Sequence, residues 1–187
     1  AVSARVEISG LDGGALTVDN VSGAIRVRDS RVSEARFDNV SGDIDAELDS
    51  ADIAIDTVSG DVRLSGAGGG SLGLDTVSGD AEFVLGQVRR VTMDTVSGDL
   101  ELATRLAPGG RIGSDSVSGS VRLRLPADTS ANLAIETFSG GISSPVGQVQ
   151  TERYGPGKRL QARLGAGDGE IRVDAFSGDV RIELTGK

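Results

Sequence analysis

The sequence predicts an all-β protein folded as a parallel β-solenoid, or β-helix, with about 19–21 residues per coil and two short strands in each coil. One seven-residue segment recurs almost unchanged, as DTVSGDV at residues 56–62, DTVSGDA at 75–81 and DTVSGDL at 94–100. Apolar and polar residues alternate on both sides of it, which is typical of strands. Nothing in the chain has the apolar spacing of a helix.

The Ser-Gly pair marks the repeat along the whole chain. Successive serines are about 20 residues apart, which is the signature of a repeat architecture. The last interval is about twice this period, so we expect one copy to have lost its signature. The serines are Ser22, Ser41, Ser59, Ser78, Ser97, Ser118, Ser139 and Ser177.

Each repeat is expected to contain two strands on either side of a bend. Counting from the serine as zero, the first covers about −7 to −3, with apolar residues at −6 and −4. The second covers about −1 to +6, with apolar residues at −1, +3 and +5. Position −1 is Val in six copies and Phe in two, Phe138 and Phe176. Because −4 and −1 are out of phase, we expect a bend between them that turns the −1 side chain inward.

An alternative architecture consists of repeated β-hairpins in an antiparallel arrangement, with Ser-Gly as a two-residue turn. This pairing sets the apolar −1 residue opposite position +2, which is Asp in five of the eight copies, and so places it on the polar face. The stacked coil has no such conflict. It also explains why the same residue type recurs at each position, which favours the solenoid.

The chain is expected to form one solenoid domain over residues 1–187, with an irregular loop at about 145–159. This region holds two of the four prolines and the only tyrosine. A strand is expected to follow it at residues 160–164. Loops that interrupt a regular scaffold often carry binding residues. The candidates for contact with a partner here are Arg153, Tyr154, Lys158 and Arg159.

The recurring DTVSGD segments with their flanking strands, between about Leu16 and Leu184, resemble the bacterial DUF4097 β-strand repeat family, an adhesin-type family. They are also similar to head-GIN-type adhesin domains. The resemblance implies a β-helical fold and a place in the bacterial cell envelope, in the periplasm or on the cell surface. The family has no established catalytic residues, so the resemblance implies none in this chain.

The polar columns of the repeat have structural interpretations. Each Ser-Gly glycine is expected at a positive φ, or at a corner without room for a Cβ. The Asn and Thr residues at −2 are expected to hydrogen-bond along the solenoid axis as ladders.

A carboxylate stands at −3 in every copy and is expected to form an Asx-turn at the bend. A less favoured alternative is a rail of oxygen ligands for calcium, with Asp56, Asp75 and Asp94 at its centre. The column contains Asp19, Asp38, Asp56, Asp75, Asp94, Asp115, Glu136 and Asp174.

Composition excludes several classes of function. The chain has no Cys and no His, so it lacks disulfides, thiolate metal sites and the commonest catalytic base. Its net charge of −9 disfavours nucleic acid as a partner. No apolar run reaches the roughly 18 residues of a membrane span. We therefore expect no catalytic residues and no cofactor.

The function expected is that of a non-catalytic structural or interaction module of the bacterial envelope, with an unidentified protein or glycan as partner. One alternative is a β-helix enzyme acting on polysaccharides, which would need a pair of carboxylates. Another is a filament subunit that self-associates through its coil ends, because neither end of the sequence shows a polar cap.

Overall fold

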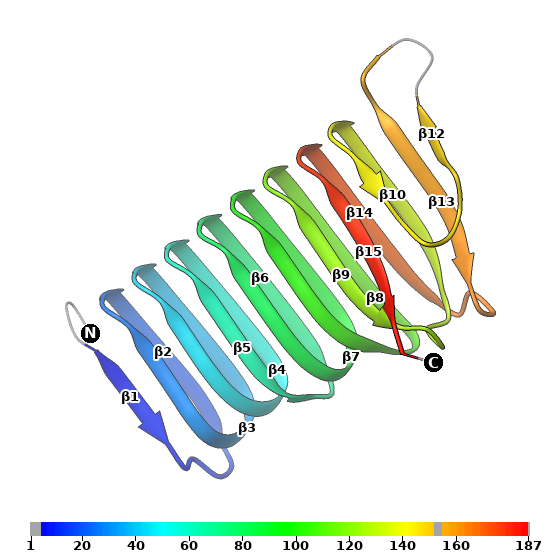
Figure 1. Ribbon diagram of the computed structural model, residues 1–187. Helices are drawn as coiled ribbons and strands as arrows, with labels where there is room; N and C mark the ends of the chain where they lie inside the picture. Colours follow the sequence, from blue (N-terminus) through cyan, green and yellow to red (C-terminus); the bar gives the residue numbers. More distant parts are fainter. Residues whose placement is uncertain (1–4, 152–154, 187) are drawn as a thin grey trace.

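The structure, a computed structural model, describes residues 5–151 and 155–186. It is all-β, without helix in the described residues, and its strands wind into a parallel solenoid (Figure 1). The predicted fold class is therefore confirmed. Antiparallel pairs occur among the described strands only at the C-terminal end of the stack, so the architecture of repeated hairpins is not the one adopted.

The described strands, in chain order, are β1 (Val6–Ser9), β2 (Ala15–Ser22), β3 (Ile25–Ser41), β4 (Ile44–Ser59), β5 (Val62–Gly68), β6 (Ser71–Ser78), β7 (Ala81–Ser97), β8 (Leu100–Ser118), β9 (Val121–Pro126), β10 (Ala131–Ser139), β11 (Ile142–Ser143), β12 (Val149–Thr151), β13 (Lys158–Leu164), β14 (Gly169–Ser177) and β15 (Val180–Thr185). The long strands β3, β4, β7 and β8 each run without a break from one Ser-Gly turn to the next.

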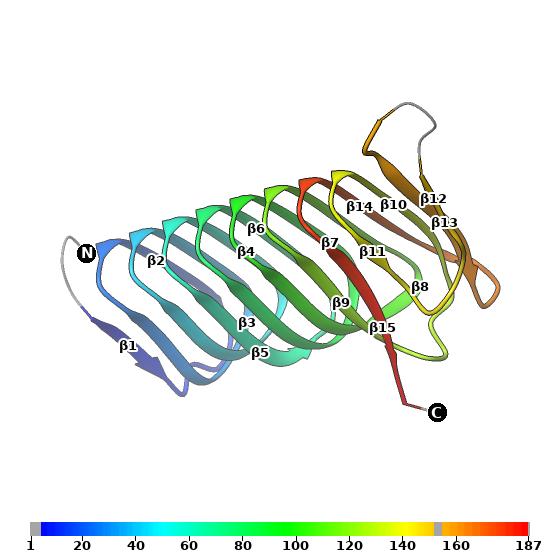
Figure 2. The same cartoon turned by 45° about the horizontal axis from the view of Figure 1, so that its top comes forward.

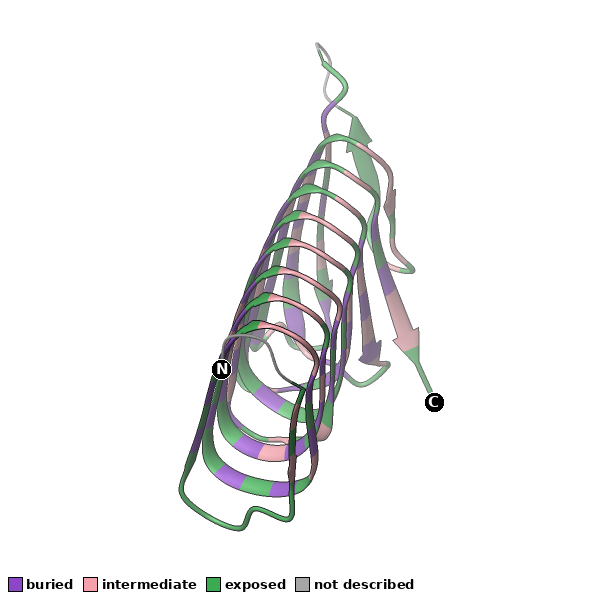
Figure 3. Cartoon of the chain, turned by 90° about the vertical axis from the view of Figure 1, so that its left-hand side faces the viewer, coloured by how far each residue is buried: buried purple, intermediate pink, exposed green. Residues whose placement is uncertain are grey.

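Each coil is flattened into two walls, as the end view in Figure 3 shows. The front wall contains β1, β5, β9, β11, β15 and the first halves of β3, β4, β7 and β8. The back wall contains β2, β6, β10, β14 and the second halves of the same long strands. The Ser-Gly turns connect the back wall to the front wall along one edge of the solenoid.

The hydrophobic core lies between the walls. Positions −6 and −4 of the back wall and +3 and +5 of the front wall are buried in nearly every copy, as the alternation predicted. Phe37, Phe83 and Met93 are among the largest fully buried side chains. With so few aromatic residues, the core is thin and consists mainly of aliphatic side chains from facing strands.

Position −1 has the opposite orientation to the one expected. The back-wall strands continue through them to the serine, so the period-two alternation is never interrupted. The polar −2 side chains are therefore buried, whereas the −1 Val and Phe side chains are 47–59% exposed. The predicted inward turn of the −1 residue was wrong, because the strand does not bend between −4 and −1. The chain turns only after position −1, at the Ser-Gly pair.

Several −2 residues cap their own turn, whereas the buried hydroxyls of Thr57 and Thr76 have no hydrogen-bond partner in the described residues, so the expected axial ladder is not a general feature of this column. Asn20 Nδ2 donates to the carbonyl of Gly23 at 3.0 Å, and Asn39 Nδ2 donates to that of Gly42 at 2.7 Å. A link to the next coil is present at Thr137, whose hydroxyl lies 3.4 Å from the carbonyl of Gly178. These bonds satisfy polar atoms that the turn would otherwise bury.

The order of the last two coils differs from their order in the sequence. Ser177 pairs with Ser118 on one side and with Ser139 on the other. The C-terminal strands β14 and β15, red in Figure 1, thus lie between β8–β9 and β10–β11, and Figure 2 shows β15 between β9 and β11. The interval between Ser139 and Ser177 therefore does not contain a repeat that has lost its Ser-Gly signature. After Ser139 the chain leaves the stack, and it returns as a coil, or level, between those of Ser118 and Ser139.

The segment that leaves the stack forms a cap on its C-terminal end. Strand β13 pairs antiparallel with β10, and β12 pairs antiparallel with β13. Leu160 and Leu164 are buried against the last coil. The expected irregular loop therefore contains a strand, and Lys158 and Arg159 belong to β13. The expectation that neither end is capped was wrong for this end.

Candidate functional site

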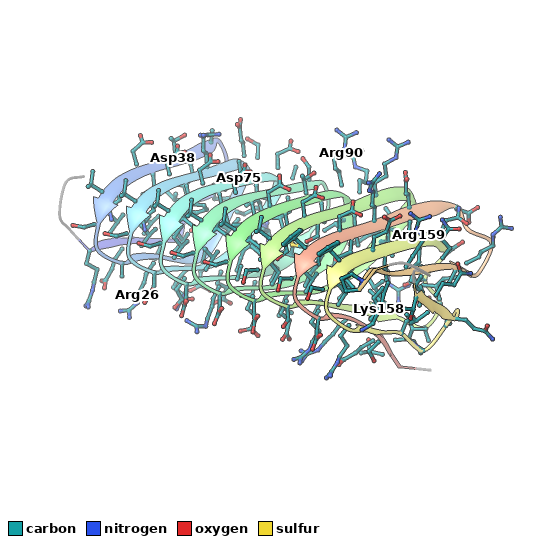
Figure 4. All side chains as sticks on the ribbon, turned by 90° about the horizontal axis from the view of Figure 1, so that it is seen from above. Arg26, Asp38, Asp75, Arg90, Lys158 and Arg159 are labelled. Atoms are coloured by element: carbon teal, nitrogen blue, oxygen red, sulfur yellow. The ribbon has the colours of Figure 1, made fainter. Side chains whose placement is uncertain are left out.

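A long groove runs along the outer face of the back wall, beside the Ser-Gly turns. Its volume is about 1090 Å³, and residues of all eight stacked levels line it. The groove is formed by the −3, −2 and −1 columns, and it ends at Gly157, Lys158 and Arg159. In Figure 4, Asp38 and Asp75 project from this side of the solenoid and Arg26 projects from the opposite side.

One side of the groove is an apolar row made of the −1 side chains. Each is about half exposed, because its two strand neighbours face the interior or the turn. At the C-terminal end, the rings of Phe138 and Phe176 stack with their centroids 5.1 Å apart. In order along the axis, the apolar row is Val21, Val40, Val58, Val77, Val96, Val117, Phe176 and Phe138.

The other side is an acidic row made of the −3 side chains. The parallel register places each carboxylate beside the next one, at a strand spacing of about 4.8 Å. Neighbours at this distance repel by roughly 1 kcal/mol in water. In order along the axis, the acidic row is Asp19, Asp38, Asp56, Asp75, Asp94, Asp115, Asp174 and Glu136.

Arginines neutralise the two ends of the acidic row. Arg36 donates to Asp38 at 2.9 Å and to Asp56 at 2.6 Å. At the other end, Arg172 donates to Asp174 at 2.6 Å, and Arg159 Nε lies 2.9 Å from Glu136 Oε1.

The middle of the acidic row has no such partners. Among the described residues, Asp75, Asp94 and Asp115 accept no hydrogen bond and form no ion pair. The groove is therefore most negative at its centre.

The pKa values reflect this arrangement. Partial burial raises the pKa of Asp94, and the charges of Asp115 and Asp75 raise it further. Burial and the contact with Asp38 raise the pKa of Asp56, against the attraction of Arg36. Burial is the largest single influence on the pKa of Asp38 and acts to raise it, but the hydrogen bond and charge of Arg36, together with hydrogen bonds shared with Asp56 and Asp19, outweigh burial, so that this pKa is lowered. The centre of the row thus carries charge that the protein itself does not compensate.

The central −3 carboxylates do not form the expected Asx-turn, and a different carboxylate column accepts backbone hydrogen bonds, from the neighbouring coil. Asp75, Asp94 and Asp115 accept no backbone hydrogen bond, because at −3 the strand is still extended. The Asp after the Ser-Gly pair, at +2, accepts the backbone N–H of the next coil instead. Asp61 N donates to Asp43 at 3.1 Å and Asp99 N to Asp80 at 2.9 Å. The recurrence of Asp at position +2 is the sequence signal for this role. From the sequence alone, we interpreted these residues only as part of a polar face.

The residue types of the acidic row suit a hard cation, but the geometry is that of a line. Among the described residues, no three carboxylates gather into a cluster that could hold a metal ion. A calcium rail at Asp56, Asp75 and Asp94 thus remains a prediction, tested by a melting experiment described in the Discussion.

The predicted partner-binding residues lie partly at the groove. Lys158 and Arg159 form its C-terminal end, where Lys158 Nζ donates to the carbonyl of Gly140 at 2.5 Å. Arg153 and Tyr154 lie outside the described residues. Sequence reasoning missed the groove itself, because it placed the apolar −1 column inside the core.

Comparison with known proteins identifies the family of the chain. No curated protein and no solved structure matches the chain. In the described residues, no helix has the length and apolar character needed to cross a bilayer. The sequence model of one family, Toastrack DUF4097, matches residues 49–183 and so includes both the regular coils and the inserted C-terminal strands. The stacked repeat that builds the groove is thus shared with a known group of proteins, and the chain belongs to the Toastrack DUF4097 family.

Proposed function

We propose that the chain is a non-catalytic interaction module of the bacterial cell envelope, located in the periplasm or on the cell surface. Its groove binds an extended partner that carries positive and apolar side chains. The observation that carries this proposal is the continuous groove, in which an acidic and an apolar row run side by side across all eight levels. A Toastrack solenoid is a structural module, and its repeated surface suits a long partner better than a small molecule.

The chemistry of the two rows indicates what the partner must offer. Asp75, Asp94 and Asp115 lack partners of their own, so a cationic side chain over them gains attraction without displacing an existing ion pair. The neighbouring Val77 and Val96 are 48% and 49% exposed, and apolar side chains of the partner would cover them. An extended polypeptide with alternating basic and apolar residues fits both requirements.

The geometry favours this reading over a polysaccharide-acting enzyme. Glycoside hydrolysis needs two carboxylates in contrasting environments, one acting as acid and the other as base or nucleophile. The central carboxylates of the acidic row repeat with nearly the same surroundings from level to level. The stacked Phe138 and Phe176 could contact a sugar ring at one end of the groove, which keeps a glycan as the second candidate partner.

A binding experiment with defined peptides tests the groove. The probe is a fluorescein-labelled peptide of alternating lysine and leucine, and fluorescence anisotropy measures its affinity. A matched peptide with glutamate in place of lysine should bind at least about tenfold more weakly, because the acidic row repels it. Equal binding of the two peptides would contradict the proposal.

Variants of the protein locate the binding. The triple variant Val58→Ser, Val77→Ser, Val96→Ser removes the centre of the apolar row. It should weaken binding of the lysine peptide about tenfold or more. Val84→Ser is the control, because Val84 is 51% exposed but lies on the front wall. A loss in the control as large as that in the triple variant would place the binding elsewhere.

Location is tested separately in the source bacterium. An antibody against the chain, applied to fractionated cells, should find it in the envelope or periplasmic fraction. Protease added to intact or outer-membrane-permeabilised cells should digest it. Recovery of the protein only from the cytoplasm, protected from protease, would refute the proposed location and leave the peptide-binding result unaffected.

A further inference from the structure

A second hollow, of about 530 Å³, lies on the outer face of the back wall, at the edge away from the Ser-Gly turns. Three arginines and one aspartate line it, which is an excess of positive charge on a chain whose net charge is −9. Figure 4 shows Arg90 projecting outward from this face. The lining residues are Asp52, Gly70, Ser71, Arg89, Arg90, Pro108, Gly109, Gly110 and Arg111.

The parallel register brings the arginines together. Arg90 of β7 pairs with Arg111 of β8, so their side chains leave adjacent strands on the same face. Their Cα atoms are therefore about 4.8 Å apart, and their like charges repel. Arg89 lies at a register shift, where β8 has four residues, 107–110, opposite one residue of β7. The extra residues form one side of the hollow, which is absent at the regular levels.

The arginines of the hollow are poorly neutralised within the protein. In the described part of the chain, Arg89 and Arg90 form no ion pair and no side-chain hydrogen bond. Asp52 already accepts a hydrogen bond from the hydroxyl of Ser71. Arg111 has an ion pair with Glu170 at 3.5 Å, but both side chains are more than half exposed, and such pairs are weak.

Glycines keep the hollow open next to the arginines. A Cβ at Gly70 would lie 1.7 Å from the carbonyl oxygen of Ala51, and one at Gly110 would lie 2.9 Å from the carbonyl oxygen of Ala107. Larger residues are therefore excluded from both positions, and no side chain from them fills the space. A compact anion can approach the backbone here while guanidinium groups contact it from two neighbouring levels.

From this geometry we propose that the hollow binds a phosphate group. Guanidinium groups present paired N–H donors that match the oxygens of a phosphate, and a divalent anion would remove the repulsion between Arg90 and Arg111. The phosphate could belong to a soluble or polymer-borne phosphate, or to the headgroup of an anionic lipid. The site is separate from the groove, so it does not depend on the function proposed above.

Titration with inorganic phosphate tests the site, with backbone amide NMR shifts as the measurement. Sodium chloride keeps the ionic strength constant, so that general screening is not mistaken for binding. Saturable shifts should appear at residues 89–90 and 107–111. The double variant Arg89→Gln, Arg90→Gln should weaken binding at least about tenfold. The absence of saturable shifts at these residues would overturn the proposal.

A second double variant, Arg163→Gln with Arg181→Gln, is the matched control. It removes the same charge from two exposed arginines outside the hollow, neither of which forms an ion pair in the described residues. It should bind phosphate as the unmodified chain does, and equal weakening in the two double variants would refute the site. In phosphate-free buffer, the Arg89→Gln, Arg90→Gln protein should melt no lower than the control. A lower melting temperature, combined with unchanged phosphate affinity, would show a structural role instead.

Vesicle flotation distinguishes the two sources of phosphate. Vesicles of phosphatidylcholine alone are compared with vesicles that also contain phosphatidic acid. Flotation that requires phosphatidic acid, and that is lost in the Arg89→Gln, Arg90→Gln protein alone, assigns the site to a lipid headgroup. Saturable binding of inorganic phosphate without flotation assigns it to a soluble or polymer-borne phosphate.

Discussion

The glycine of most Ser-Gly pairs combines two constraints that only glycine satisfies. Gly79 has a φ of 122°, a conformation that residues with a side chain rarely adopt. A Cβ added there would lie 2.2 Å from the carbonyl oxygen of Gly60 in the neighbouring coil. The expectation of a positive φ or a crowded corner is thus confirmed for both reasons at once. At Gly178 the close approach remains, at 2.0 Å, although its φ is not in the positive region.

Gly79→Ala should therefore lower the free energy of unfolding by roughly 3 kcal/mol, through backbone strain and overpacking. Gly73→Ala is the control, since its Cβ would meet nothing closer than 4.0 Å and its φ is not positive. That variant should be neutral or stabilised by up to about 1 kcal/mol. Urea denaturation measures both variants. Similar midpoints would contradict the assigned role of the turn glycine.

Asp94 should make stability depend on pH in a defined direction. Its pKa in the folded protein lies above the ordinary 3.8, because burial and the neighbouring carboxylates disfavour its charge. A group whose pKa is raised on folding contributes its whole stabilisation at pH values below its pKa in the unfolded chain. This contribution is lost as the pH rises through its pKa in the folded protein. Asp94→Asn should thus raise the melting temperature by about 1–3 °C at neutral pH, and the gain should vanish in acid below 3.8.

Asp128 provides a control of opposite sign. A hydrogen bond from Arg105 lowers its pKa, so its contribution is present above the unfolded pKa and is lost as pH falls through the folded one. Asp128→Asn should therefore lower, not raise, the melting temperature at neutral pH. Melting curves recorded across the acid range decide the matter, and a shift of the same sign in both variants would show that the Asp94 interpretation is wrong.

At the scale of the strand and turn, two carboxylate columns that look alike in the sequence have different roles. Asp80 accepts the backbone N–H of Asp99 in the next coil, whereas Asp75 accepts no hydrogen bond. Asp80→Ala should lower the free energy of unfolding by about 1 kcal/mol, because the hydrogen bond is lost. Asp75→Ala should lower it by less than about 0.5 kcal/mol. Denaturation midpoints compare the two variants, and a larger loss in Asp75→Ala would contradict the assignment.

Melting curves of the unmodified chain and of Asp75→Asn test for calcium. If the acidic row binds no cation, millimolar Ca²⁺ and EDTA should leave the melting temperature of the unmodified chain unchanged. A calcium-dependent rise that is lost in Asp75→Asn would instead establish the row as a cation site, because a ligand of the folded state raises stability by mass action.

The alternation of each strand separates inner from outer positions. Leu74 is 1% exposed between the walls, and Leu74→Asp would bury an unpaired charge there. We expect a loss of about 4 kcal/mol or more. The Arg63 side chain is 59% exposed on the front wall and forms ion pairs with Asp61 at 3.6 Å and Glu82 at 4.0 Å. Arg63→Ser should therefore change the free energy of unfolding by no more than about 0.5 kcal/mol. Comparable denaturation midpoints for the two variants would refute the orientation of these strands.

For the whole molecule, the inserted position of β14 predicts where the stack is most stable. Although close to the C-terminus in sequence, β14 has a partner strand on each side, and Ile171 and Val173 are fully buried. Its amides should therefore exchange with deuterium as slowly as those of central β6, while β1 and β12, each with one partner strand, exchange fast. Exchange in β14 as fast as in β1 would contradict the strand order.

The sequence alone predicted the solenoid, its period and most of its core, because stacking repeats the same environment at each position. It did not predict the groove, since an apolar −1 residue indicates burial, and these side chains are only half buried. It could not predict the strand order either. A periodic sequence shows that the coils around Ser118, Ser139 and Ser177 are equivalent, but equivalence does not specify which of them are neighbours. In the structure, β13 occupies one edge of β10 and β14 occupies the other.

The insertion of β14 and β15 also sets an order of events during synthesis. The strands on either side of the insertion, β8–β9 and β10–β11, leave the ribosome before the strands that join them laterally, β14 and β15. At about 5–20 residues per second, those edges wait roughly 2–8 seconds for their partner. Unpaired strand edges attract other strands, and here a nascent β10 carries the same repeat as β14 and can occupy its place against β8. If β10 takes that place first, completion of the fold requires it to give way to β14, a strand exchange that a solenoid stacked in sequence order does not need.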